Sequence, residues 1–110
     1  MTFSVKVSKQ AQEDIKGIFE YIAFELQSED VAIRQLQRLE DSIKRLNYMP
    51  ERFRAYLKEP WYSRGLRVMP VDNYIVFYIP NGETHTVSVI RVMYGGRDID
   101  TQLNKYTKLS

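Results

Sequence analysis

The sequence predicts a small α+β domain in which an antiparallel-dominated sheet packs against an α-helical hairpin. Three observations support this class: a short alternating segment at residues 3–7, two amphipathic helical patterns separated by a short break, and three β-rich runs after residue 60. Helices joined by a short connection pack side by side, and strands joined by short turns pair antiparallel. The expected order is therefore β-α-α-β-β-β, in a single domain spanning residues 1–110.

The first half of the chain is expected to hold one strand and two helices. Residues 3–7 alternate apolar and polar side chains, which is the period of a half-buried strand. Ser8 is placed to cap a helix at about 9–27, in which apolar residues recur at spacings of three and four. Ser28 precedes a second helix of the same kind at about 29–47, with two acids in its first turn.

The second half changes to a β period. A basic connector runs between Pro50, which ends the second helix, and Pro60. One strand is indicated around residues 66–70, and β-branched and aromatic runs follow at 74–79 and 84–92. Between the last two, an Asn-Gly dipeptide favours a hairpin turn. These runs predict a three-stranded meander.

The carboxyl end is expected to leave the sheet. Gly95 and Gly96 stop the last strand, and Asp98 is placed to cap a possible short helix holding Ile99 and Leu103. His85, the single histidine, falls within the last β run and is predicted to be a mid-strand residue.

Composition restricts the chemistry. The chain has no cysteine, which removes disulfides and thiolate catalysis and fits a reducing compartment. It also has no apolar run of membrane-spanning length and no secretion-type leader in its first residues. We expect a cytoplasmic protein with no membrane partner. One histidine and no phosphate-binding glycine loop predict no metal site and no cofactor.

Charge is unevenly distributed. Residues 1–30 carry three basic and six acidic side chains, a net charge of −3, whereas residues 31–67 carry nine and four, a net charge of +5. A basic block of this size attracts a nucleic acid, a nucleic-acid-bound machine or an acidic protein. The alternative is an ordinary solvated surface.

A cluster of arginine and tyrosine is the remaining candidate for chemistry. Arg64 and Arg67 flank the first meander strand, and Arg91, Tyr94 and Arg97 lie on or after the last one. We expect these cations to converge on one concave face, where they can bind phosphates or stabilise a charged transition state without metal. The alternative is that the arginines pair with nearby acids, which are Asp72, Glu83, Asp98 and Asp100.

Three segments resemble the toxins of the RelE/ParE superfamily. Residues 65–78 are similar to the second and third strands of these toxins, residues 89–99 to their last strand and tail, and residues 5–15 to their amino end. The resemblance runs from residue 3 to about 103. It implies the toxin of a type II toxin–antitoxin system, which arrests growth, serves plasmid stabilisation and is held inactive by a co-expressed antitoxin that wraps around it.

The superfamily has two activities, and the resemblance leaves both open. ParE-like members inhibit DNA gyrase, whereas RelE-like members cleave messenger RNA on the ribosome, without metal, by attack of a ribose 2′-hydroxyl. RelE-like nucleases have an arginine where this chain has Ile75, and Arg67 alone represents their basic second strand. The ending at residues 94–98 is similar to the ParE type. We therefore expect gyrase inhibition, with ribosome-dependent cleavage as the alternative and a binding module without toxicity as a third.

Each activity implies its own residues and partners. A RelE-like enzyme would use Arg67, Arg91, Tyr94 and Arg97 as catalytic residues. A gyrase inhibitor would bind its target through Arg54, Arg64, Arg67, Tyr94 and Arg97. The expected partners are a cognate antitoxin and either DNA gyrase or the ribosome with its message.

Overall fold

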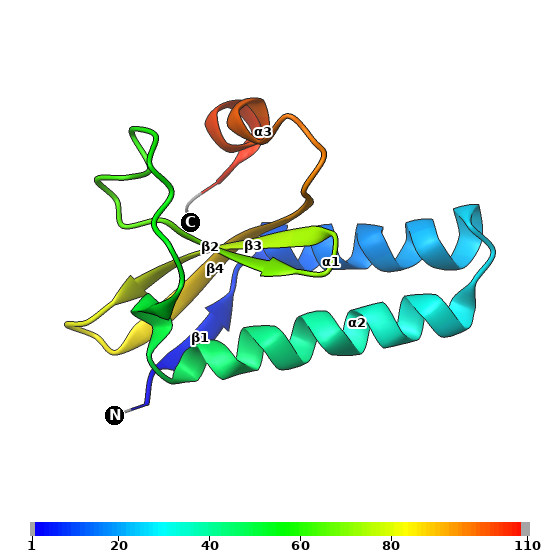
Figure 1. The fold of residues 1–110 in the computed structure, drawn as a ribbon, viewed down its shortest axis with the longest axis horizontal. Helices are drawn as coiled ribbons and strands as arrows, with labels where there is room; N and C mark the ends of the chain where they lie inside the picture. The colour runs from blue at the N-terminus through cyan, green and yellow to red at the C-terminus, as the bar shows by residue number, and fades with distance from the viewer. Residues whose placement is uncertain (1, 109–110) are drawn as a thin grey trace.

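The computed structural model describes residues 2–108 and has the predicted order of elements (Figure 1). The strands are β1 Ser4–Val7, β2 Arg67–Val71, β3 Tyr74–Asn81 and β4 Thr86–Tyr94, and the helices are α1 Lys9–Glu20, α2 Glu29–Lys44 and α3 Ile99–Tyr106. Helix α1 continues into a π-helical turn, Tyr21–Glu25, and α2 into a 3-10 turn, Arg45–Asn47. A second 3-10 turn, Pro50–Arg52, begins the connector to β2, which in the structure extends beyond Pro60 and comprises residues 50–66.

The four strands form one sheet in the order β1-β4-β3-β2. The meander β2-β3-β4 is antiparallel, and β1 pairs in parallel with the first part of β4. Helices α1 and α2 extend together as an antiparallel hairpin from one side of the sheet (Figure 1). The predicted α+β class, the hairpin and the short terminal helix are all confirmed.

The hairpin covers one face of the sheet, and the main core lies between them. Leu39 and Ile43 of α2 pack with Val76 and Tyr78 of β3. Tyr78 is fully buried, its hydroxyl donates to the Pro50 carbonyl, and burial raises its pKa to about 12. The apolar stripes of both helices therefore face the sheet, as their periodicity predicts.

The opposite face of the sheet is also covered, which the sequence did not predict. Trp61 and Leu66 of the connector and Leu103 of α3 pack on Phe77. The indole nitrogen of Trp61 donates to Asn104 at 2.9 Å, which ties the connector to α3. The connector and the terminal helix thus form a second small core over the meander.

Local capping agrees with prediction at two of three sites. The Ser8 hydroxyl accepts a hydrogen bond from the Ala11 amide at 3.0 Å, and Asp98 accepts one from the Thr101 amide at 3.3 Å. Ser28 precedes α2 as expected, but its side chain makes no capping hydrogen bond.

The position predicted for His85 is wrong. It lies in the β3–β4 turn with a φ of 52° and not within a strand, because β4 begins at Thr86. The side chain of Asn81 accepts hydrogen bonds from the amides of Glu83 and Thr84, and so extends the turn beyond the Asn-Gly pair. His85 instead places its ring edge-on to Phe3, with centroids 5.5 Å apart.

Candidate target-binding site

Tyr94 and Arg97 lie together where the chain leaves the sheet. Tyr94 is 52% exposed, and its ring meets the Tyr74 ring edge-on, with centroids 5.9 Å apart. A Cβ atom on Gly96 would lie 2.6 Å from the Tyr94 ring, so the absence of a side chain there lets this ring fold back over the chain. Burial raises the pKa of Tyr74. An exposed tyrosine, supported by the half-buried Tyr74 of β3, thus lies close in sequence to the exposed cation Arg97.

Arg91 is buried in the structure. It is 4% exposed, and its guanidinium binds both carboxylate oxygens of Asp14 in α1, at 2.7 and 3.0 Å. It also donates to the Thr107 hydroxyl at 3.2 Å. Asp14 in turn accepts the amide of Val92 at 3.0 Å, beyond the end of β1. This ion pair joins α1, β4 and the end of α3, and leaves little of Arg91 for a substrate.

The predicted convergence of the cations on one concave face is wrong for Arg67 and Arg91. Strand β3 lies between β2 and β4, and cross-strand partners share a face of the sheet. Arg67 pairs with Tyr78, in the core under the hairpin, whereas Arg91 pairs with Phe77, in the second core. The two arginines therefore start from opposite faces.

The remaining predicted cations lie at the connector. Arg67 donates to the carbonyls of Glu51, at 3.1 Å, and Phe53, at 2.6 Å, and so holds the connector against β2. Arg54 is exposed, and the exposed guanidinium of Arg64 stands 5.0 Å from the centre of the Trp61 ring. Arg67 pairs with Tyr78 of β3, whereas Tyr94 pairs with Tyr74 at the start of that strand. The predicted target-binding residues thus form two groups, with Tyr94 and Arg97 apart from Arg67 and its neighbours Arg54 and Arg64.

Asp72 and Asp100 were expected as partners of the clustered arginines, but each forms a surface ion pair with a different residue. Asp72, in the β2–β3 turn, is held by Arg38 of α2 at 2.7 Å. Asp100 binds Lys58 and also accepts the hydroxyl of Tyr56. Hydrogen bonds from Arg38 and Gln35 lower the pKa of Asp72, and hydrogen bonds from Lys58 and Tyr56 lower the pKa of Asp100.

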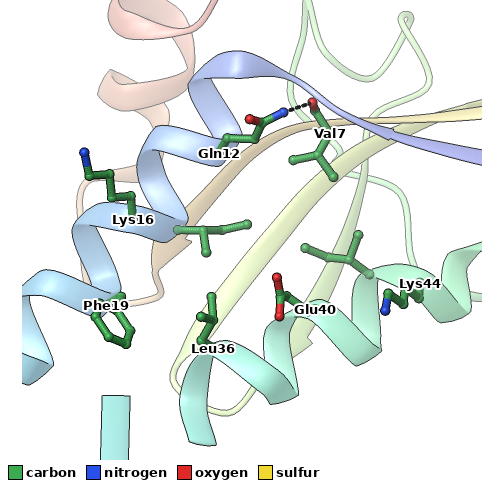
Figure 2. A pocket seen from close by; sticks show the side chains of 9 residues that line it. Val7, Gln12, Lys16, Phe19, Leu36, Glu40 and Lys44 are labelled. Carbon is green, nitrogen blue, oxygen red and sulfur yellow. Dashed lines mark hydrogen bonds between the residues drawn. The ribbon is translucent and has the colours of Figure 1, made fainter. Parts of the chain in front are cut away.

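An apolar groove of about 590 Å³ runs between the two helices and β1 (Figure 2). Phe19 of α1 and Leu36 of α2 face each other across it, and Lys16, Glu40 and Lys44 stand at its margin. Its apolar lining with charged margins suits an amphipathic segment. We call it the hairpin groove.

Within residues 2–108 no three His, Asp or Glu side chains gather as a metal-binding group. No helix in this described part of the chain combines the length and the apolar character needed to cross a bilayer.

Sequence reasoning did not single out Asp14, although a signal was present. Asp14 lies three residues after Ala11 and four before Ile18, so it falls on the apolar stripe that faces the sheet. A carboxylate on such a stripe requires a buried partner. That partner is Arg91, which sequence reasoning assigned to the site instead.

The architecture is that of a RelE/ParE-like toxin: a helical hairpin on a four-stranded sheet with a short terminal helix. The family model for the ParE toxin of the type II toxin–antitoxin system parDE matches residues 5–99. The match spans well over half of the chain, so the protein belongs to the ParE toxin family. No curated protein sequence matches it.

Solved structures of toxin–antitoxin complexes share this fold. A chain of the chromosomal ParDE system of Pseudomonas aeruginosa aligns with a TM-score of 0.68 and 17% identity, over 84% of this chain and 96% of that one. A chain of the Mycobacterium tuberculosis RelBE2 complex gives 0.60 and 17%, over 86% and 99%. A chain of the archaeal RelE–RelB complex of Pyrococcus horikoshii gives 0.58 and 18%, over 88% and 99%. At these identities the likeness establishes the fold alone.

Proposed function

We propose that this toxin arrests growth in the cytoplasm by binding and inhibiting DNA gyrase, and that a cognate antitoxin neutralises it. Besides membership of the ParE family, one observation carries the proposal: two of the four predicted catalytic residues are already engaged within the protein. Arg91 is engaged by Asp14, and Arg67 is engaged by backbone carbonyls. An inhibitor that acts by binding needs a surface, and Tyr94 and Arg97 provide an exposed one.

The antitoxin is proposed to cover the hairpin groove or an edge of the sheet with a short acidic or amphipathic segment. The groove supports this because its apolar walls lie beside Lys16 and Lys44. The outer edge of β1 has no neighbouring strand in the described sheet, and such edges accept added strands, whereas the start of β2 is already bridged by Ala55 of the connector. Co-expression with the protein of an adjacent small gene should restore growth, and the two chains should purify together.

The test of gyrase inhibition is supercoiling by purified gyrase with added toxin. The variants Tyr94→Ala and Arg97→Ala are each expected to raise the half-inhibiting concentration by about threefold to tenfold, because a binding surface loses affinity gradually. Higher salt should weaken inhibition further. Lys6→Ala is the matched control, since Lys6 is an exposed cation on β1 and should leave inhibition unchanged.

Ribosome-dependent cleavage is the contrary outcome. Purified toxin should leave messages on programmed ribosomes intact. If messages are cut and gyrase is unaffected at micromolar toxin, the protein is a RelE-like nuclease and the proposal is wrong.

A further inference from the structure

A second groove of about 800 Å³ lies between α1 and the carboxyl end of β4. Gly17, Tyr21 and Leu26 line its helical wall, and Tyr94 and Arg97 line the wall opposite, beside the tail. We call it the tyrosine groove. It is separate from the hairpin groove, because the two share no lining residue.

Gly17 has no structural reason to be glycine in the free protein. It lies inside α1, where glycine costs helix stability relative to alanine. Its φ is not positive, and a Cβ atom added to it would meet no atom within 4 Å apart from its chain neighbours and the backbone of its own helix. The missing side chain therefore relieves neither strain nor a clash. Its effect is to leave the helix backbone uncovered by a side chain at the wall of the groove.

The groove also concentrates exposed apolar surface. Tyr21 is 55% exposed, Leu26 56% and Tyr94 52%. The π-helical turn brings the first two to one wall, since the Leu26 amide donates to the Tyr21 carbonyl five residues earlier. Such π turns occur frequently at functional sites. Large apolar side chains that gather in a concave surface indicate a protein or ligand contact.

The charges that line the groove distinguish between a nucleic acid and a polypeptide as its occupant. Glu13 and Asp14 lie on the helical wall, one turn before Gly17, and Arg97 is the single cation among the lining residues. Asp14 is already paired with Arg91, so the free charges are one acid and one base. A nucleic-acid strand would bring phosphates towards Glu13 with one arginine to offset them. An apolar polypeptide segment fits this balance better.

We propose that the tyrosine groove binds a polypeptide segment of gyrase, which lays a bulky apolar side chain against the tyrosines and crosses α1 at Gly17. A carboxylate on the segment is the partner of Arg97. This inference rests on the proposed function. It specifies that Tyr94 and Arg97 contact the gyrase protein and not its DNA.

The experiment combines thermal unfolding with gyrase supercoiling for Gly17→Ala and Gly17→Gln. Both changes favour the helix, so both variants should melt at or above the wild-type temperature. Inhibition should fall nevertheless: Gly17→Gln, whose side chain enters the groove, should raise the half-inhibiting concentration at least about tenfold, and Gly17→Ala by less. Ser42→Ala is the control, since it also improves helix propensity but lies in α2 and lines neither groove.

Three results would overturn the inference, and they are distinguishable. If Gly17→Gln inhibits as well as the wild type, the groove is not the contact, although gyrase inhibition stands. If the wild type does not inhibit gyrase at all, the proposed function fails and the inference fails with it. If the wild type binds labelled duplex DNA without gyrase, and Gly17→Gln loses that binding, the groove holds nucleic acid. If Gly17→Gln unfolds at a lower temperature than the wild type, the same inhibition and DNA-binding outcomes are read from Gly17→Ala instead.

Discussion

At the scale of single residues, the clearest consequence of the structure concerns Arg91. A buried ion pair whose partner is removed leaves an uncompensated charge, which costs about 3–5 kcal/mol. Arg91→Ala should therefore destabilise the fold by about that amount, because Asp14 would remain, with its side chain only 15% exposed. Urea unfolding measures the loss.

A double-mutant cycle separates pairing from packing. Asp14→Ala alone should also destabilise the protein, and the double variant should lose less than the sum of the two single variants. Strict additivity would show that the two side chains contribute independently. A catalytic Arg91 would instead give a stable but inactive variant.

At the scale of elements, α3 is a structural part of the domain and not a loose tail. Its Leu103 is 1% exposed and packs in the second core with Trp61 and Phe77. Leu103→Ala should cost about 2–5 kcal/mol of stability, as leucine-to-alanine changes in cores do. Lys105→Ala, an exposed change in the same helix, should stay within about 0.5 kcal/mol. Equal effects of the two changes would mean that α3 is not docked in solution.

The docking of α3 also affects the position of Tyr94 and Arg97. Tyr94 and Arg97 lie between β4 and α3, so the helix fixes where the chain goes after the sheet. Asp98 caps α3 and thereby defines the length of this turn. Loss of α3 docking should therefore weaken the proposed gyrase inhibition, although Leu103 itself is buried.

At the scale of the whole molecule, two carboxylates link distant elements and should shape the dependence of stability on pH. Asp72 joins the β2–β3 turn to α2 through Arg38, and Asp100 joins α3 to the connector through Lys58 and Tyr56. Their pKa values are lowered in the folded protein. Their stabilisation is therefore full above the unfolded value of about 3.9 and is lost as the pH falls through the folded values.

Urea midpoints between about pH 7 and pH 2 measure this effect. The wild type should lose stability as the pH falls below about 4, and the double variant Asp72→Asn, Asp100→Asn should lose less over the same range. The two curves should approach each other at the acid end, where the carboxyls of the wild type are protonated. Parallel curves would show that neither ion pair contributes to folding.

The sequence by itself determined the class of the fold, the order of its elements and the superfamily. Periodicity and local capping are properties of neighbouring residues, and Ser8 and Asp98 cap their helices as expected. The family match at residues 5–99 agrees with the resemblance seen in the segments. These features depend on patterns among residues that lie close together in the sequence, so the sequence alone reveals them.

Only the tertiary structure decided on which face of the sheet each arginine lies and which residue it pairs with. Arg91 and Arg67 look alike in sequence, yet the register of their strands against β3 places them on opposite faces of the sheet and gives them different partners. The partner of Arg91 lies 77 positions away. The tyrosine groove likewise joins Gly17 of α1 to Tyr94 and Arg97 of the tail. Ion pairs and grooves are formed by residues that folding brings together from distant parts of the chain, and no local pattern specifies which ones will meet.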